Sequence, residues 1–121
     1  METAVHHRVS QLIKDQELFR EACYIDGRWI SSTTASIPVD DPATGEIIGH
    51  VPKLGRTETR TAIDAAAAAY PAWRGRTAKE RAALLRKWFE LMMANQEDLA
   101  HLMTLEQGKP LTESRAGHTC G

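Results

Sequence analysis

The sequence predicts an α+β fold in which short antiparallel strands joined by tight turns precede long helices. Two turn signals support the first half: Asp26-Gly27 lies between apolar residues, and Gly45 closes a turn that begins with Asp41-Pro42. The second half rests on residues 77–110, where large apolar side chains recur at spacings of three and four. A chain of 121 residues is long enough for one small domain.

The strands are predicted on both sides of the two turns. An Asp-Gly pair is typical of a two-residue type I′ hairpin, because both central positions need positive φ. Residues 23–30 are therefore expected to form one hairpin. At the second turn, the residue before Pro42 avoids the helical region and Gly45 can take positive φ, so strands are expected at 37–39 and 47–52. Together these strands predict a small antiparallel sheet.

The first long helix is predicted over residues 55–70. Gly55 can serve as its N-cap, and Glu58 in the first turn meets the positive end of the helix. Ile63 and Tyr70 line one face together with alanines that allow close approach of another helix. Pro71 is expected to end or kink this helix.

A second helical stretch is predicted to begin at Thr77 and to stop at Gly108. Thr77 and Glu80 have the spacing of a capping box, and Pro110 follows the terminal glycine. A kink or restart is expected within 95–98. The apolar face consists of Leu84, Leu85, Trp88, Leu91, Met92, Leu99, Leu102 and Met103. A core helix is the simplest interpretation of this pattern, and another helical turn is expected over 111–116.

Composition excludes several classes of protein. The formal net charge of −1 gives no basic excess for nucleic acid or an anionic membrane surface. The longest apolar run, residues 65–70, is too short to span a bilayer, and residues 1–17 contain no continuous apolar segment of a secretory signal. Only Cys23 and Cys120 are present, which indicates a reducing, cytoplasmic location.

The histidines and the late cysteine give no convincing site. His6 and His7 are adjacent, so their side chains point apart and a solvated pair is favoured over a metal pair. His118 and Cys120 supply two ligands, whereas a stable zinc site wants four. Cys120 as a nucleophile would need a general base and a shaped pocket. The residues alone therefore predict no catalytic group.

The acidic residues and the glycines also favour a structural interpretation. Glu97, Asp98 and Glu106 are expected to be solvated charges on helix faces. The glycines form neither GxGxxG nor a phosphate-binding P-loop, so no cofactor-binding residue is predicted.

Four segments in fixed order carry a resemblance: CYIDGRWI, VDDPATGEIIGHVP, AAYPAWR and TAKERAALLRKWFELMMANQEDLAHLMTLEQGKPL. The series resembles the amino-terminal part of the aldehyde dehydrogenase superfamily over residues 18–114. Within it, the last segment is most similar to bacterial NAD(P)-dependent succinate-semialdehyde dehydrogenases of 4-aminobutyrate degradation. Residues 1–17 would then be a flexible or short helical leader, and residues 115–121 a tail unlike the family.

The resemblance implies a homo-oligomeric enzyme whose subunit is several times longer than this chain. It implies the start of an α/β dinucleotide-binding domain, with NAD or NADP as cofactor, a nucleophilic cysteine and a glutamate that activates water. Those groups have no match here, and Cys120 matches the nucleophile neither in context nor in order. The resemblance also implies a structural monovalent cation, whose matching positions are Val39 and Glu106.

The sequence AGHTCG departs from the family pattern, which would continue with a long amphipathic helix. This departure suggests a truncated or frame-shifted reading, or a cut fragment, that is inactive and binds no cofactor alone. The alternative is an interaction module whose uncovered apolar helix faces bind a partner, a complementary fragment or a second copy.

Overall fold

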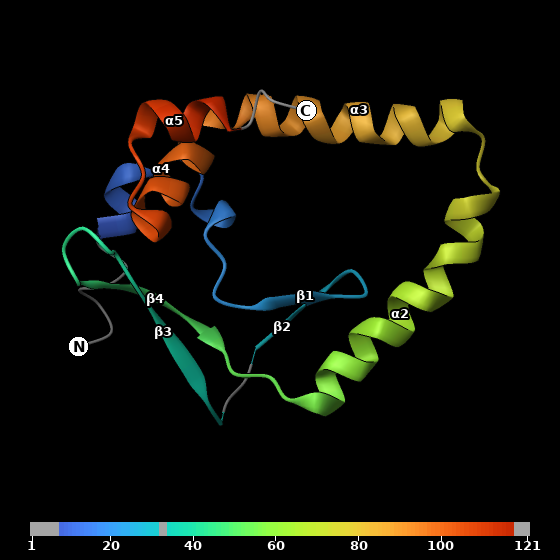
Figure 1. Ribbon diagram of the computed structural model, residues 1–121, viewed down its shortest axis with the longest axis horizontal. Coiled ribbons are helices and arrows are strands. Elements are labelled where there is room, and N and C mark those ends of the chain that lie inside the picture. Colours follow the sequence, from blue (N-terminus) through green and yellow to red (C-terminus); the bar gives the residue numbers. More distant parts are fainter. Residues whose placement is uncertain (1–7, 32–33, 118–121) are drawn as a thin grey trace.

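The computed structural model describes residues 8–31 and 34–117, in which two hairpins lead into four helices (Figure 1). The predicted α+β class is confirmed. Residues 8–12 are also helical. The elements that follow are η1 (Gln16–Leu18), β1 (Cys23–Ile25), β2 (Arg28–Ile30), β3 (Ser36–Asp40), β4 (Ile47–Pro52), α2 (Arg56–Gly75), α3 (Ala78–Ala94), α4 (Gln96–Gln107) and α5 (Leu111–Ala116). No helix of the described residues is long and apolar enough to cross a membrane.

Both predicted hairpin turns are confirmed by their backbone angles. Asp26 and Gly27 have φ of 51° and 73°, as a type I′ turn requires. Gly45 has φ of 73°, and its N–H donates to the Asp41 carbonyl over 2.7 Å. The strands form two separate two-stranded sheets, not the single sheet expected, because β1 pairs with β2 and β3 with β4 across their own turns.

The predicted ends of the helices are confirmed in α3 and α4. The Thr77 hydroxyl accepts the Glu80 N–H over 3.2 Å, and the Glu80 carboxylate accepts the Thr77 N–H over 2.7 Å. The helical stretch breaks at Asn95, within the expected segment, and α4 ends at Gly108 with φ of 77°. Helix α2, by contrast, continues through Pro71 to Gly75.

The core joins the two ends of the described chain. Its buried members are Val9 and Ile13 from the leader, Ile48 from β4 and Leu105 from α4. Phe19, Val39 and Leu102 pack against them. Segments from both sides of the two hairpins therefore close one small core, whereas α2 and α3 extend away from it (Figure 1).

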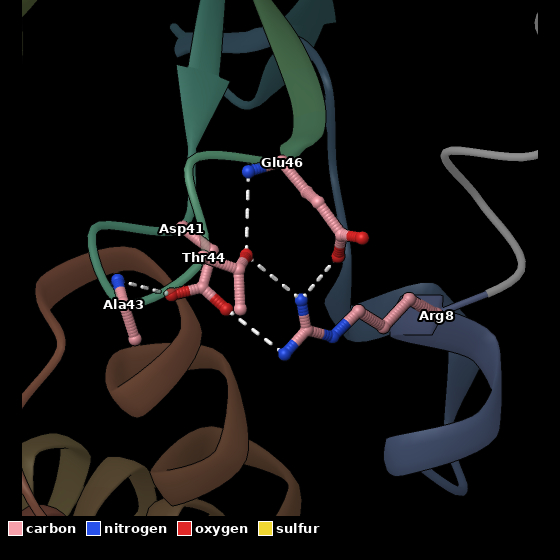
Figure 2. Close-up of polar contacts among 5 residues, drawn as sticks. All are labelled: Arg8, Asp41, Ala43, Thr44 and Glu46. Atoms are coloured by element: carbon pink, nitrogen blue, oxygen red, sulfur yellow. Dashed lines mark hydrogen bonds and ion pairs between the residues drawn. The ribbon is translucent and has the colours of Figure 1, made fainter.

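Arg8 fastens the leader to the turn between β3 and β4 (Figure 2). One terminal nitrogen donates to Thr44 Oγ1 over 3.1 Å and lies 2.5 Å from Glu46 Oε2. The other lies 3.1 Å from Asp41 Oδ2, and Asp41 Oδ1 accepts the Ala43 N–H over 2.8 Å. The side chain of Asp41 is buried. Its negative charge is therefore balanced by a cation from a distant segment, as burial of a charge requires.

Asp98 forms a second contact between the leader and the rest of the chain, so the expectation that this residue is solvated was wrong. The side chain is buried, and its two oxygens accept the N–H groups of Lys14 and Asp15 over 2.9 and 2.8 Å. These two hydrogen bonds lower the pKa of Asp98 below its ordinary value, and the bond from Asp15 contributes most.

Glu97 is exposed and forms a two-bond ion pair with Arg115, with distances of 2.7 and 3.0 Å. The hydrogen bonds from Arg115 lower the pKa of Glu97.

Candidate functional site

A small pocket lies between the segment before β1, the β3–β4 hairpin and the end of α4. Its volume is about 30 Å³, more than the roughly 10–15 Å³ that a cavity needs to hold one water molecule. The residues that line it are Phe19, Arg20, Glu21, Val39, Ile48, Gly49, His50, Val51 and Glu106. Val39 and Glu106, which the resemblance singled out, thus line the same cavity although α2 and α3 separate them in sequence.

The backbone beside Val39 is irregular. Val39 pairs with Gly49, but Asp40 pairs with Ile47, so one residue of β4 is skipped. A bulge of this kind interrupts the hydrogen-bond ladder and can leave backbone oxygens without a strand partner. The skipped residue is Ile48 of β4, which also lines the pocket.

Glu21 is a pocket residue that the sequence analysis did not find. Its Oε1 accepts the His50 N–H over 2.6 Å and lies 4.0 Å from His50 Nδ1. Gly49 makes this approach possible, because a Cβ there would lie 3.1 Å from Glu21 Oε1 and 2.8 Å from the Phe19 ring. A glycine inside a predicted strand is a recognised signal of close approach, and it is the only sign of this contact in the sequence.

Carboxylate oxygens, which hard cations prefer as ligands, line part of the cavity. Two carboxylates, Glu21 and Glu106, line the cavity with the irregular backbone at Val39. The Arg20 guanidinium bonds to Glu17 over 2.9 and 3.3 Å and lies 5.2 Å from the centre of the Trp29 ring. Among the described residues, no group of three or more His, Cys, Asp or Glu could hold a metal ion. The pocket thus brings two carboxylates together without a full set of side-chain ligands among the described residues.

Among the described residues, the connection from β4 to α2 lacks a glycine-rich dinucleotide-binding loop. The one strand that leads directly into a long helix is β4, followed by residues 53–55 and α2. This connection has no glycine-rich loop, and the Glu58 carboxylate accepts the Gly55 N–H over 2.9 Å at the helix start. A negative side chain therefore already occupies the end of α2 that would attract a phosphate. His6, His7, His118 and Cys120 lie outside the described residues.

The model of the aldehyde dehydrogenase family matches residues 29–119. The chain belongs to the aldehyde dehydrogenase family. The resemblance drawn from the four sequence segments is thereby confirmed, and so is the assignment to an oxidoreductase family.

Two relatives of this aldehyde dehydrogenase chain act on semialdehydes, by their names. The glutarate-semialdehyde dehydrogenase of Pseudomonas aeruginosa is 60% identical over 104 residues, which are 85% of this chain and 22% of the relative. The NADP(+) succinate-semialdehyde dehydrogenase GabD of Escherichia coli is 56% identical over the same shares. The chain thus spans about a fifth of the length of the curated relatives that it matches.

Solved structures agree with this aldehyde dehydrogenase assignment. The crystal structure of an NADP-dependent enzyme of E. coli matches with a TM-score of 0.84 and 54% identity, and covers 88% of this chain and 22% of that one. A succinate-semialdehyde dehydrogenase of Burkholderia pseudomallei matches with the same TM-score and coverage at 52% identity. The arrangement of strands and helices is therefore the one found in a much longer subunit.

Proposed function

We propose that this chain is the amino-terminal segment of an NAD(P)-dependent aldehyde dehydrogenase that oxidises succinate semialdehyde to succinate in 4-aminobutyrate degradation. The observation that carries the proposal is the family match over residues 29–119, joined with 56% identity to a succinate-semialdehyde dehydrogenase. Glutarate semialdehyde is the second candidate substrate, because a relative named for it is 60% identical. Both aldehydes carry a terminal carboxylate and differ by one methylene.

The proposed reaction converts an aldehyde and water to a carboxylate while NAD(P) accepts a hydride. It needs a thiolate nucleophile, donors at the developing oxyanion and a cofactor site. The described residues supply no cofactor cradle, and no residue of this chain matches the nucleophile. We propose an architectural role for this segment, and the isolated 121 residues are expected to be inactive. The whole enzyme is proposed to be a cytoplasmic homo-oligomer.

The proposal includes a structural monovalent cation at the pocket between β3 and α4. The Val39 carbonyl and the Glu106 carboxylate would hold it, and the shared cavity of about 30 Å³ supports this pairing. A cation that binds the folded state stabilises it by mass action. Na⁺ or K⁺ should therefore raise the melting temperature above that in choline chloride at equal ionic strength. Glu106→Gln should abolish that difference, and Glu113→Gln on α5 should keep it.

Two assays test the enzymatic proposal. For the 121-residue chain, titration calorimetry should detect no binding of NAD or NADP. Absorbance of the reduced nicotinamide should show no oxidation of succinate semialdehyde. Joining the chain to the part of the E. coli relative that it does not match should give an active subunit. Turnover by the short chain, or a folded but inactive joined subunit, would contradict the proposal.

The substrate is tested on the gene extended past codon 121 in the frame that continues the family pattern. Succinate semialdehyde should be preferred over short uncharged aldehydes. Preference for glutarate semialdehyde would select the second candidate. Preference for an uncharged aldehyde would be compatible with the family assignment but would contradict the proposed substrate.

A second candidate function is that of an interaction module. The specific observation in its favour is the exposure of large apolar side chains along α2 and α3. The two candidate functions differ in what the chain must bind. An interaction module binds another protein, whereas an architectural segment packs against the rest of its own enzyme subunit.

A further inference from the structure

The turn between β1 and β2 places an exposed aspartate directly before an exposed glycine. Asp26 and Gly27 have φ of 51° and 73°, and positive φ is unfavourable for a residue that carries a Cβ. The turn therefore holds Asp26 in a strained conformation. The space around Gly27 is open, since a Cβ there would meet only the Tyr24 hydroxyl, at 3.9 Å. The backbone nitrogen of Gly27 is thus accessible to a neighbouring side chain.

The Asp26 carboxylate is not held in place by another group. Among the described residues, no hydrogen bond or ion pair engages this carboxylate or the Gly27 N–H. By contrast, Asp98 accepts two backbone N–H groups, and Asp15 Oδ1 accepts the Glu17 N–H over 3.0 Å. The side chain of Asp26 is therefore free to rotate toward its own main chain.

At three other aspartates, the backbone nitrogen that follows is not available as a nucleophile. Pro42 follows Asp41 and has no N–H. The N–H of Asp41, which follows Asp40, donates to the Glu46 carbonyl over 2.8 Å. Asp64 lies inside helix α2, where the next N–H is bonded to a carbonyl one helical turn earlier. The β1–β2 turn differs from these places because it combines an unbonded carboxylate with an unbonded amide.

We propose that Asp26 is a site of spontaneous isomerisation, at which the aspartyl residue rearranges to an isoaspartyl residue through a cyclic imide. The Gly27 nitrogen bonds to Asp26 Cγ, a C–O bond of the protonated carboxyl breaks, and the hydroxyl leaves as water with the amide proton. Water then opens the imide. Opening at Cγ restores aspartate, whereas opening at the main-chain carbonyl leaves that carbonyl as a free carboxylate and carries the chain through Cγ. The reaction needs no oxidant and no reactant besides water.

The β1–β2 hairpin can open far enough for the imide ring to close. Its strands have three residues each and pair only with one another. A two-stranded hairpin is marginally stable by itself, and the buried core cluster contains none of its residues. The hairpin can therefore open locally while the core stays closed. Opening relieves the positive φ of Asp26 and lets its carboxyl group turn toward the Gly27 nitrogen.

Isomerisation changes the structure of the hairpin because it adds a methylene to the main chain within the turn. A two-residue turn then no longer sets the register in which Tyr24 faces Trp29, with ring centres 5.1 Å apart. The contact of Arg20 with the Trp29 ring, at 5.2 Å, depends on the same register. Because α2 contacts β1, the surface beside α2 changes as well. Amides of β1 and β2 should therefore exchange faster in the isomerised chain.

The test incubates the purified 121-residue chain in neutral buffer and follows its proteolytic peptides by chromatography and mass spectrometry. The peptide with Asp26 should divide into two species of equal mass, and the new one should accept methyl groups from a methyltransferase specific for isoaspartyl carboxylates. The peptide with Asp64 should remain a single species. Asp26→Glu should abolish the second species, because the imide would need a larger ring. Asp26→Asn should form isoaspartate faster, because an uncharged amide is a better electrophile than a carboxylate.

The control variant Ala65→Gly separates the effect of structure from that of the dipeptide. It creates a second Asp-Gly pair inside α2, where Asp64 should isomerise at least about tenfold more slowly than Asp26, a difference in barrier of about 1.4 kcal/mol. Equal rates at the two aspartates would overturn the proposal. So would a single species at Asp26 after a time in which the urea-unfolded chain has isomerised there. Unchanged amide exchange in the isomerised chain would contradict the predicted loss of the hairpin.

Discussion

Replacing Asp98 by asparagine should loosen the leader from α4. The carboxylate accepts two N–H groups, from Lys14 at 2.9 Å and Asp15 at 2.8 Å, and is 7% exposed. An amide keeps one acceptor and turns two donors toward the other N–H, which loses its partner. A hydrogen bond to a charged group contributes about 1.5–3 kcal/mol, and an orphaned buried donor costs about 1–3 kcal/mol. We therefore expect the free energy of unfolding to fall by about 2–3 kcal/mol.

The pH dependence of the free energy of unfolding provides a second test of the role of Asp98. Because the pKa of Asp98 is lowered from the ordinary value of 3.8, its contribution is complete well above pH 3.8. The contribution is lost as the pH falls through 3.8 toward the lower folded pKa. The original protein should therefore lose more stability over this acid range than Asp98→Asn does, and the two curves should converge.

Urea unfolding at pH 7 measures the difference, and hydrogen exchange at Lys14 and Asp15 measures it locally. Asp64→Asn is the matched control, because Asp64 is an exposed aspartate within α2. If Asp98→Asn lowers stability no more than Asp64→Asn, and the two amides exchange at unchanged rates, the proposed role of the carboxylate is wrong.

Three further substitutions test local features of the fold. Thr77→Ala removes the hydroxyl that accepts the Glu80 N–H and should lower the urea midpoint by the equivalent of about 0.5–2 kcal/mol, whereas Thr77→Ser should restore most of it. Gly108→Ala should be destabilising by at least about 1 kcal/mol in thermal unfolding, because φ is 77° and the new Cβ would lie 2.8 Å from Pro42 Cγ. Arg8→Met should speed proteolysis of the leader, since it removes the cation beside three oxygen groups of the β3–β4 turn, and an unchanged cleavage rate would contradict that role.

The features that sequence predicted well are those determined within a few residues. The Asp26-Gly27 turn, the Thr77–Glu80 capping box and the helix end at Gly108 each depend on neighbours in the chain. Their residue types have few alternatives, because positive φ and an unsatisfied helix start both demand specific chemistry. Pro71 did not end α2, which continues for one further turn to Gly75 although an interior proline removes a helical hydrogen bond.

The features that sequence missed depend on contacts between distant segments. Asp98 lies 84 positions from Lys14, and no local pattern distinguishes it from the exposed Glu97 beside it. Val9 and Ile13 stand in a polar leader, yet they supply half of the buried core cluster. Val39 and Glu106 were joined by the family resemblance alone, and the shared pocket could not be inferred from their spacing.

The long sequence separation within the core has a consequence for synthesis on the ribosome. Ile13 can pack into the core only after Leu105, which follows it by about 90 residues, has been synthesised. At about 5–20 residues per second, the leader leaves the exit tunnel and stays without its partners for roughly 5–20 s. Throughout that interval, Val9 and Ile13 are free to contact other nascent chains or chaperones. Slower translation of the codons for α2 and α3 should lengthen this interval, and with it the yield of aggregated chain.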